Sequence, residues 1–332
     1  MTRILRRLAW SVFIVWSVTT LTFFINNVLP SDPARMAAGP QARPKDVERI
    51  RAQLGLDKPV VTQYGIFMSR LLHVAPAGAG SIDHASCVAF AGLHVDLGRS
   101  YQQRRPVATI LGERLPRTLF LALAGVLVQI MIGVTSGVFA ALKRGTAWDH
   151  GAVGLSLLGI SAPTFILGLV LQFFFARKFR ILPLDGFGTT NTEHLLSVIL
   201  PALTLGIFGA AYYTRLVRDE MIGLMREDYV RTARAKGLSE GRVVIVHALR
   251  NALVPLITVI ALDLGALVGG AIVTETLFRW PGVGALSVTA LLDRDGPIIL
   301  GTVLVTSTAI VLASILVDIC YVALDPRVRH QT

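Results

Sequence analysis

The chain has 332 residues, of which 53% are hydrophobic and 16% are charged, and its mean hydropathy is +0.62. Soluble proteins carry about 25% charged residues, so this composition indicates an integral membrane protein and argues against a soluble enzyme. The formal net charge is +11, but the basic residues are dispersed along the flanks of apolar segments and are not interleaved with aromatic residues, which argues against nucleic-acid binding. Anionic headgroups of the lipid bilayer suffice as partners for most of this charge.

Six apolar runs reach the roughly 20 residues that an α-helix needs to cross the hydrocarbon core of a bilayer. We therefore predict an all-α integral membrane fold with six transmembrane helices, which places both termini on the same side. The predicted spans are residues 8–29, 118–142, 151–175, 195–214, 253–277 and 298–324. These spans divide the chain into an N-terminal end with the first span (1–29), an outer loop (30–117), a five-helix core (118–324) that contains a basic loop at 215–252, and a tail (325–332).

The first span follows Arg3, Arg6 and Arg7, as the core of a secretory signal peptide would. Its apolar stretch of about 22 residues exceeds the 7 to 15 residues of a signal core. No small-x-small cleavage site follows before Pro30. We expect a retained membrane anchor.

The outer loop is long enough to fold in part. Pro44 can open an amphipathic helix, and a second amphipathic run extends over 59–72. Helices of this kind lie on the membrane surface or cover the ends of their own spans. The segment 75–80 is rich in Gly, Ala and Pro, which predicts a flexible loop.

Three histidines and one aspartate of the outer loop invite a metal-site hypothesis: His73, His84, His94 and Asp83. Metal sites show tighter ligand spacing than this. We expect solvated loop residues and no metal site on this chain.

Basic residues concentrate at one set of span ends. The N-terminus, the turn at 143–144, the loop at 215–252 and the tail carry more Lys and Arg than the short connections on the opposite side. The positive-inside rule therefore predicts that both termini and the loop at 215–252 are cytoplasmic. The outer loop is also basic, but loops longer than about 60 residues are translocated largely regardless of their charge.

The third predicted span contains a serine, Ser161, which leaves open an intramembrane serine protease. Such an enzyme needs a histidine base near its nucleophile. The candidates His150, His194 and His247 all map near the membrane surfaces rather than at one common depth, which weakens this alternative.

The most informative segment is EDYVRTARAKGLSEGRVVIVHALRNALVP at 227–255, a basic stretch between two apolar spans. Residues 228–236 predict about two helical turns, and Gly237 suits the left-handed residue that ends a helix. Ser239 with Glu240 can cap and start the next helix. We predict a helix, a sharp corner and a second helix that re-enters the membrane.

The composition of this short helix indicates a docking element. The small residues Ala233 and Ala235 would let it settle closely into a groove of a partner, and Arg231, Arg234 and Lys236 would supply charge around the contact. The residues that we expect to couple this chain to its partner are Asp228, Tyr229, Arg231, Thr232, Ala233, Arg234, Ala235, Lys236 and Gly237.

The loop from Tyr229 to Leu253, with its Ala-Lys-Gly and His-Ala-Leu-Arg-Asn-Ala runs, resembles that of ABC importer permeases, specifically the B-type subunits of dipeptide, oligopeptide and nickel importers. The similarity extends over nearly the whole chain. Further motifs typical of the family are LGLDKP at 54–59, DLGRS at 96–100, TETLF at 274–278, WPGVG at 280–284 and DPRVRH at 325–330.

The resemblance implies a type I ABC importer permease of the bacterial inner membrane. The partners it implies are a second, C-type permease subunit, two ABC ATPase subunits and an extracytoplasmic solute-binding protein. ATP and Mg would be bound by the ATPase subunits, and we expect no cofactor and no enzymatic activity on this chain, since no Lys follows a Gly as a phosphate-binding loop requires. Dipeptides or oligopeptides are the favoured cargo, with nickel, glutathione or another small solute as alternatives.

Asp263 is the ionisable residue deepest within a predicted span, and such residues are costly enough to be functional candidates. It either lines the translocation path, where it could meet the amino end of a peptide, or makes an inter-helix hydrogen bond. Gly265 and Gly269 have the small-xxx-small spacing of a close helix contact, which suits a seam between two permease subunits. A further alternative is a secondary transporter with Asp263 as a proton relay, although the chain shows no clear internal repeat.

Overall fold

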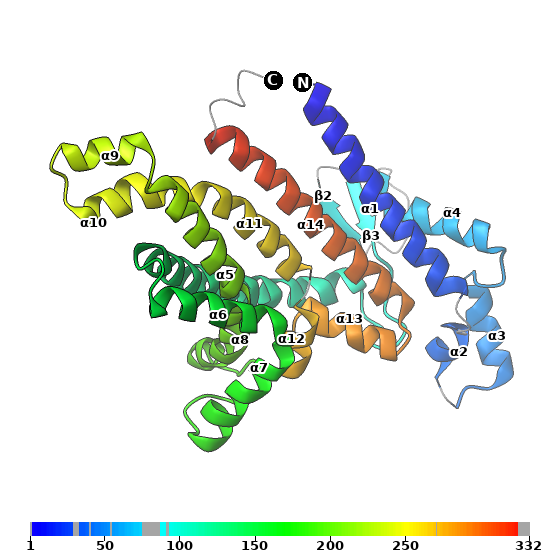
Figure 1. The fold of residues 1–332 in the computed structure, drawn as a ribbon. Helices are drawn as coiled ribbons and strands as arrows, with labels where there is room; N and C mark the ends of the chain where they lie inside the picture. The colour runs from blue at the N-terminus through cyan, green and yellow to red at the C-terminus, as the bar shows by residue number, and fades with distance from the viewer. Residues whose placement is uncertain are drawn as a thin grey trace. The chain divides into compact units, whose positions relative to one another are not determined.

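The computed structural model describes residues 2–28, 33–39, 41–53, 55–74, 87–90, 93–269 and 271–324. The chain forms two compact units, one of Met1–Arg117 and Gly282–Val311 and the other of Thr118–Pro281 and Leu312–Thr332. Helices dominate both units (Figure 1). The predicted tail, the predicted loop at 75–80, and Asp83 and His84 lie outside the described residues.

The first unit consists of helices and one small sheet. Its elements are α1 (Thr2–Val28), α2 (Pro33–Ala38), α3 (Pro44–Gln53), α4 (Val60–Leu71), β1 (His73–Val74), β2 (Cys87–Phe90), β3 (Leu93–Asp96), the start of α5 (Val107–Leu142), α13 (Val283–Leu292) and most of α14 (Gly296–Leu324). The two predicted outer-loop helices are confirmed. Each starts at or just after a proline, Pro44 or Pro59, whose missing N–H is not needed in a first helical turn.

The sequence did not predict the sheet. It is antiparallel, with the order β1-β3-β2, and His73 lies opposite His94 in the register. Its strands are only two to four residues long, too short for an alternating pattern to stand out.

Helix α4 covers one side of α1. The ring of Phe23 lies 5.4 Å from that of Tyr64 and 5.1 Å from that of Phe67, measured between centroids. The hydroxyl groups of Tyr64 and Thr20 form a hydrogen bond of 2.7 Å. The second amphipathic helix therefore packs on its own span, one of the two arrangements expected from its pattern.

Asp295, the residue directly before α14, caps the turn at residues 100–103 that precedes α5. Its carboxylate accepts hydrogen bonds from the Ser100 hydroxyl at 2.5 Å and from the backbone N–H groups of Tyr101 at 3.3 Å and Gln102 at 3.2 Å. Below this turn, α5 packs against α13 and α14 through a buried cluster around Val107 and Val283. The DLGRS motif is thereby fixed to the start of α14.

The second unit carries most of the predicted core. Its helices after α5 are α6 (Ala147–Ser161), α7 (Thr164–Leu171), the π-helix η2 (Gln172–Lys178), α8 (Asn191–Leu224), α9 (Asp228–Ala235), α10 (Glu240–Arg242), the π-helix η3 (Val243–Leu249), α11 (Arg250–Val268) and α12 (Ile272–Leu277).

Within the described residues, five helices are long and apolar enough to cross a membrane, and the number is six if one bent helix pair counts as a single span. The bent pair is the third predicted span, which turns by 104° between α6 and α7. Pro163 explains the bend, because it lacks an N–H and forces Ala162 into an extended conformation, with ψ at 134°.

Two other span ends differ from the prediction. Helix α8 starts at Asn191 because Thr190 and Glu193 form a capping box ahead of the apolar run. The fifth predicted span is interrupted, since α11 ends at Val268 and α12 begins only at Ile272. Gly269 occupies the C-cap of α11, and its N–H donates to the carbonyl of Gly265 at 2.9 Å.

Close contacts between α5 and α8 hold the middle of this unit. A Cβ atom added to Gly133 would clash with Tyr213, and one added to Gly206 would clash with Val128. Small residues of this kind let membrane helices approach closely. Tyr213 also belongs to a buried cluster that includes Ala252 and Leu256 of α11.

Candidate coupling site

The candidate site is the loop between α8 and α11, built around helix α9. Glu227 is extended, with φ at −67° and ψ at 149°, and its carbonyl group accepts hydrogen bonds from Val230 at 3.1 Å and Arg231 at 3.2 Å. Asp228 follows in the first turn, where a carboxylate complements the helix dipole. Its side chain also lies 3.6 Å from that of Arg231.

The corner after α9 forms as predicted. Gly237 is left-handed, with φ at +76°, and nothing lies within 4 Å of a Cβ atom added there, so the backbone conformation alone favours glycine. The N–H of Gly237 donates to the carbonyl of Arg234 at 2.9 Å, and that of Leu238 donates to the carbonyl of Ala233 at 3.3 Å. These two bonds define a Schellman motif.

The start of the second helix differs from the prediction. Ser239 occupies the N-cap of α10, but its side chain makes no capping hydrogen bond. Glu240 instead accepts two hydrogen bonds from Arg234, at 2.7 and 3.2 Å, which bridge the corner. This hydrogen bonding raises the pKa of Arg234 above its ordinary value.

The inner face of α9 is apolar. Val230 and Ala233 pack with Val243 in a buried cluster, and α9 folds back against η3 (Figure 1). The prediction that Ala233 faces a partner is therefore wrong. Only 5% of Ala233 is exposed, because its small side chain allows α9 to approach its own chain closely.

The outer face of α9 is polar and exposed. The predicted coupling residues on this face are Asp228, Tyr229, Arg231, Thr232, Arg234, Ala235, Lys236 and Gly237. Of the two predicted small contacts, Ala235 remains available to a partner.

A residue that the sequence did not single out ties α9 to the membrane helices. The side chain of Asn251, in the first turn of α11, donates a hydrogen bond to the Tyr229 hydroxyl at 3.0 Å and another to the carbonyl of His247 at 3.1 Å. Asn251 belongs to the His-Ala-Leu-Arg-Asn-Ala run, which was the available signal. Helix α9 thus has both an apolar and a polar attachment to the segment that leads into α11.

Helix α11 in turn packs along α8. The buried contact includes Tyr213 and Met221 of α8, Ala248 of η3 and Leu256 of α11. A displacement of α9 would therefore act on a packed pair of membrane helices rather than on a loose loop.

Asp263 lies further along α11 and is half-buried in this chain. The neighbouring Tyr213 hydroxyl is buried and has no partner in good hydrogen-bond geometry in the described part of the chain, although the Asp263 carboxyl is close enough to interact with it. Gly265 is buried and Gly269 is half-buried. The subunit seam at these two glycines stays a prediction.

The geometry gives no support to a serine nucleophile. Ser161 is exposed at the end of α6, whereas His150 lies in the first turns of the same helix, with its ring bonded to the carbonyl of Thr146. Eleven residues of helix place the two about 16 Å apart along the axis.

These features define a polytopic helical permease with a helix, a corner and a second helix between two of its spans. The family model of binding-protein-dependent transport system inner membrane components matches residues 133–330, and the N-terminal model of such membrane components matches residues 1–122. The chain belongs to this family, and it is a membrane permease subunit of an ABC importer. The predicted family of the chain is thus confirmed.

Known relatives align over almost their entire length. The chain is 40% identical over 330 residues to a putative peptide transport system permease protein of Brucella abortus (strain 2308), covering 98% of both chains. It is 37% identical to the dipeptide transport system permease protein DppB of Escherichia coli (strain K12), covering 99% of this chain and 98% of DppB. It is 36% identical to the glutathione transport system permease protein GsiC of Escherichia coli O6:H1 (strain CFT073), covering 99% of both.

A solved structure shares the fold. An inward-facing conformation of the MetNI methionine ABC transporter aligns with a TM-score of 0.50 and 19% identity, covering 68% of this chain and 98% of the matched chain. The predicted fold class, an all-α type I ABC importer permease, is confirmed.

Proposed function

We propose that this subunit forms one half of a peptide translocation path, with a second, C-type permease as the other half. Two ABC ATPase subunits, one beneath each permease, drive transport, and the one beneath this chain binds its cytoplasmic loop. An extracytoplasmic solute-binding protein delivers the cargo. ATP and Mg belong to the ATPase subunits, and this chain carries no cofactor and no ATPase site of its own. Both termini and α9 lie on the cytoplasmic side of the bacterial inner membrane, as the distribution of Lys and Arg predicts.

The observation that carries this proposal is the two-sided character of α9. Its inner face is fixed to the chain by Val230, Ala233 and the Tyr229–Asn251 hydrogen bond. Its outer face is exposed and polar along its whole length. A helix that is attached to its own chain on one face and exposed on the other can be displaced by a bound ATPase subunit and can transmit this displacement to α11.

Asp263 lines the path in this proposal and is a candidate contact for the cargo. The relatives are named for the transport of peptides, dipeptides and glutathione, all of which carry an ammonium group that complements a carboxylate. Among the described residues, the Asp263 carboxyl interacts with the Tyr213 hydroxyl, which leaves acceptor capacity on its two oxygens. Nickel or another small solute is the alternative cargo.

Vesicle labelling tests the orientation and the docking together. Thr232→Cys in a background without Cys87 and Cys320 places a thiol on the exposed face of α9. In vesicles without the ATPase subunits, a membrane-impermeant maleimide should label this thiol only when the vesicles are inside-out. Addition of the ATPase subunits should protect the thiol from labelling. Gln102→Cys, on the exposed turn before α5, serves as the control and should label only from the opposite side. Labelling of Thr232→Cys from outside would overturn the proposal.

A further inference from the structure

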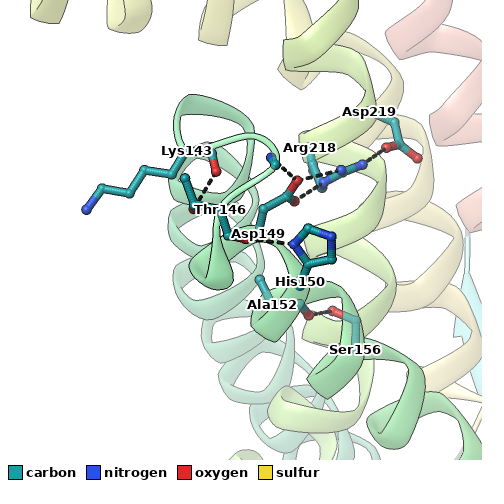
Figure 2. Close-up of polar contacts among 9 residues, drawn as sticks. Lys143, Thr146, Asp149, His150, Ala152, Ser156, Arg218 and Asp219 are labelled. Atoms are coloured by element: carbon teal, nitrogen blue, oxygen red, sulfur yellow. Dashed lines mark hydrogen bonds and ion pairs between the residues drawn. The ribbon is translucent and has the colours of Figure 1, made fainter.

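Asp149 and Arg218 form a polar contact between α6 and α8, away from helix α9 and the corner that follows it (Figure 2). The guanidinium of Arg218 donates from Nε at 2.5 Å and from Nη2 at 3.0 Å to the two carboxylate oxygens of Asp149. Only 5% of the Asp149 side chain and 21% of the Arg218 side chain are exposed. A paired geometry of this kind fixes both the distance and the orientation of the two side chains.

The same carboxylate holds the turn between α5 and α6. It accepts a hydrogen bond from the N–H of Gly145 at 2.9 Å, and Gly145 is left-handed, with φ at +76°. Within the turn, the Thr146 hydroxyl donates to the carbonyl of Lys143 at 2.6 Å (Figure 2). Asp149 therefore joins the turn at residues 143–146 to Arg218 through its two oxygens.

Arg218 lies in the last two turns of α8, the helix that leads into α9. Helix α6 packs along α8, and Gly159 lies close to Ala211 further along the same contact. The Asp149–Arg218 pair is thus at the end of the α6–α8 contact that is nearest to the coupling loop.

We propose that the Asp149–Arg218 pair is a positioning device for coupling. It makes α6 and the turn at 143–146 move together with the base of α8 when the ATPase subunits displace α9. Without it, the displacement would still reach α8 and α11, but it would pass to α6 only through the apolar packing of α6 on α8, which fixes neither the turn at 143–146 nor its distance from Arg218. This inference rests on the proposed role of α9. It adds a second element, α6, to the part of the chain that the ATPase subunits displace.

The pair has a matched internal control. The Nη1 group of Arg218 also donates to Asp219 at 2.7 Å, but the side chain of Asp219 is 66% exposed. Asp219→Asn removes a carboxylate from the same guanidinium without disturbing the turn. Arg218→Lys and Asp149→Asn keep the size of the side chains but remove the paired geometry.

The test uses the complete complex of both permeases and both ATPases in liposomes, with the binding protein and a dipeptide. We expect Arg218→Lys and Asp149→Asn to assemble normally and hydrolyse ATP, and to lower the uptake per ATP hydrolysed at least fivefold. The double variant should be no worse than either single variant, because both remove one interaction. Asp219→Asn should stay within twofold of the wild type. An unchanged ratio in the two single variants, or additive losses, would overturn the proposal.

A distance measurement covers the case in which the variants assemble poorly. Spin labels at Arg144→Cys and Glu227→Cys, both exposed positions, measure the distance between the turn at 143–146 and the connection from α8 to α9. This distance shows whether the two segments move together. The wild-type distance should stay constant between the nucleotide-free and ATP-trapped states, and it should change in Arg218→Lys. A wild-type distance that changes with nucleotide would overturn the proposal. Failure of the proposed function would look different, since wild-type uptake would then not require the ATPase subunits at all.

Discussion

Two carboxylates meet helix α8 in this subunit, and they differ in how fully they are satisfied. Asp149 accepts two hydrogen bonds from Arg218 and one from a backbone N–H. Asp263 is half-buried, and in the part of the chain that the structure describes it interacts with the Tyr213 hydroxyl, without good hydrogen-bond geometry. The first has little capacity left for a ligand, whereas the second retains most of it.

This difference distinguishes a carboxylate that holds structural elements together from one that can still bind a ligand. A buried charge that is paired and hydrogen-bonded holds the elements that supply its partners, and it loses stability when one partner is removed. A carboxylate with unused acceptors in a membrane segment is costly unless a cavity or a ligand compensates it. We therefore expect changes at Asp149 to affect the folded subunit and its coupling, and changes at Asp263 to affect the cargo.

The largest effect should follow from Asp149→Ala. It leaves the Arg218 guanidinium in a largely buried position with only an exposed partner, and we expect a loss of about 2 kcal/mol, below the range for fully buried pairs because 21% of Arg218 is exposed. The thermal unfolding midpoint in detergent measures this loss. Asp219→Asn is the control and should leave the midpoint unchanged. Equal shifts in the two variants would contradict the distinction between the carboxylates.

Asp263→Asn should act on transport rather than on assembly. If the carboxylate meets an ammonium group of the cargo, its neutralisation should raise the apparent KM for uptake about tenfold, or about 1.4 kcal/mol. The complex should purify with all subunits. Tyr213→Phe is the control and should assemble normally, because it removes a hydroxyl that has no well-formed hydrogen bond. A defect of Asp263→Asn in assembly alone would support an inter-helix role instead.

The Asp149–Arg218 pair also shows which features could not be predicted from the sequence. The apolar spans, the helices after Pro44 and Pro59, and the left-handed Gly237 were predictable because each depends on a local pattern. Asp149 and Arg218 are 69 residues apart, and no local pattern connects them. Such a pair follows only from the packing of α6 on α8.

The helix of the candidate coupling site was predictable in its position but not in its orientation. The sequence indicated a short helix at 228–236, and α9 occupies 228–235. It could not show which face turns inward, because Val230 and Ala233 are only two residues among many polar ones in a short segment. Ser239 is at the cap position without a capping hydrogen bond, and the hydrogen bonds from Arg234 to Glu240 bridge the corner instead, a contact that no local pattern predicts.

Gly237→Ala extends the comparison from charges to the backbone. An alanine at φ +76° should cost about 1 kcal/mol and loosen the corner, which lowers uptake per ATP hydrolysed. Gly241→Ala is the matched control, because Gly241 is helical, has no positive φ and has open space around its Cα. We expect that variant to be neutral or slightly stabilising. Equal uptake per ATP in the two variants would count against the corner as a transmitting element.

The smallest effects should come from the charged residues around α9, because they are exposed, whereas Asp149 and Asp263 are buried or half-buried. Arg234 is already engaged by Glu240, whereas Lys236 is exposed next to the corner. Lys236→Glu should therefore weaken retention of the ATPase subunits on an affinity column, and the weakening should diminish as salt rises, since exposed charges are screened. Glu240→Gln is the control and should leave both retention and the unfolding midpoint nearly unchanged, because exposed ion pairs contribute little to stability. Salt-independent loss of the ATPases in Lys236→Glu would instead indicate a steric contact at this position, so that the polar face of α9 would bind its partner through shape rather than charge.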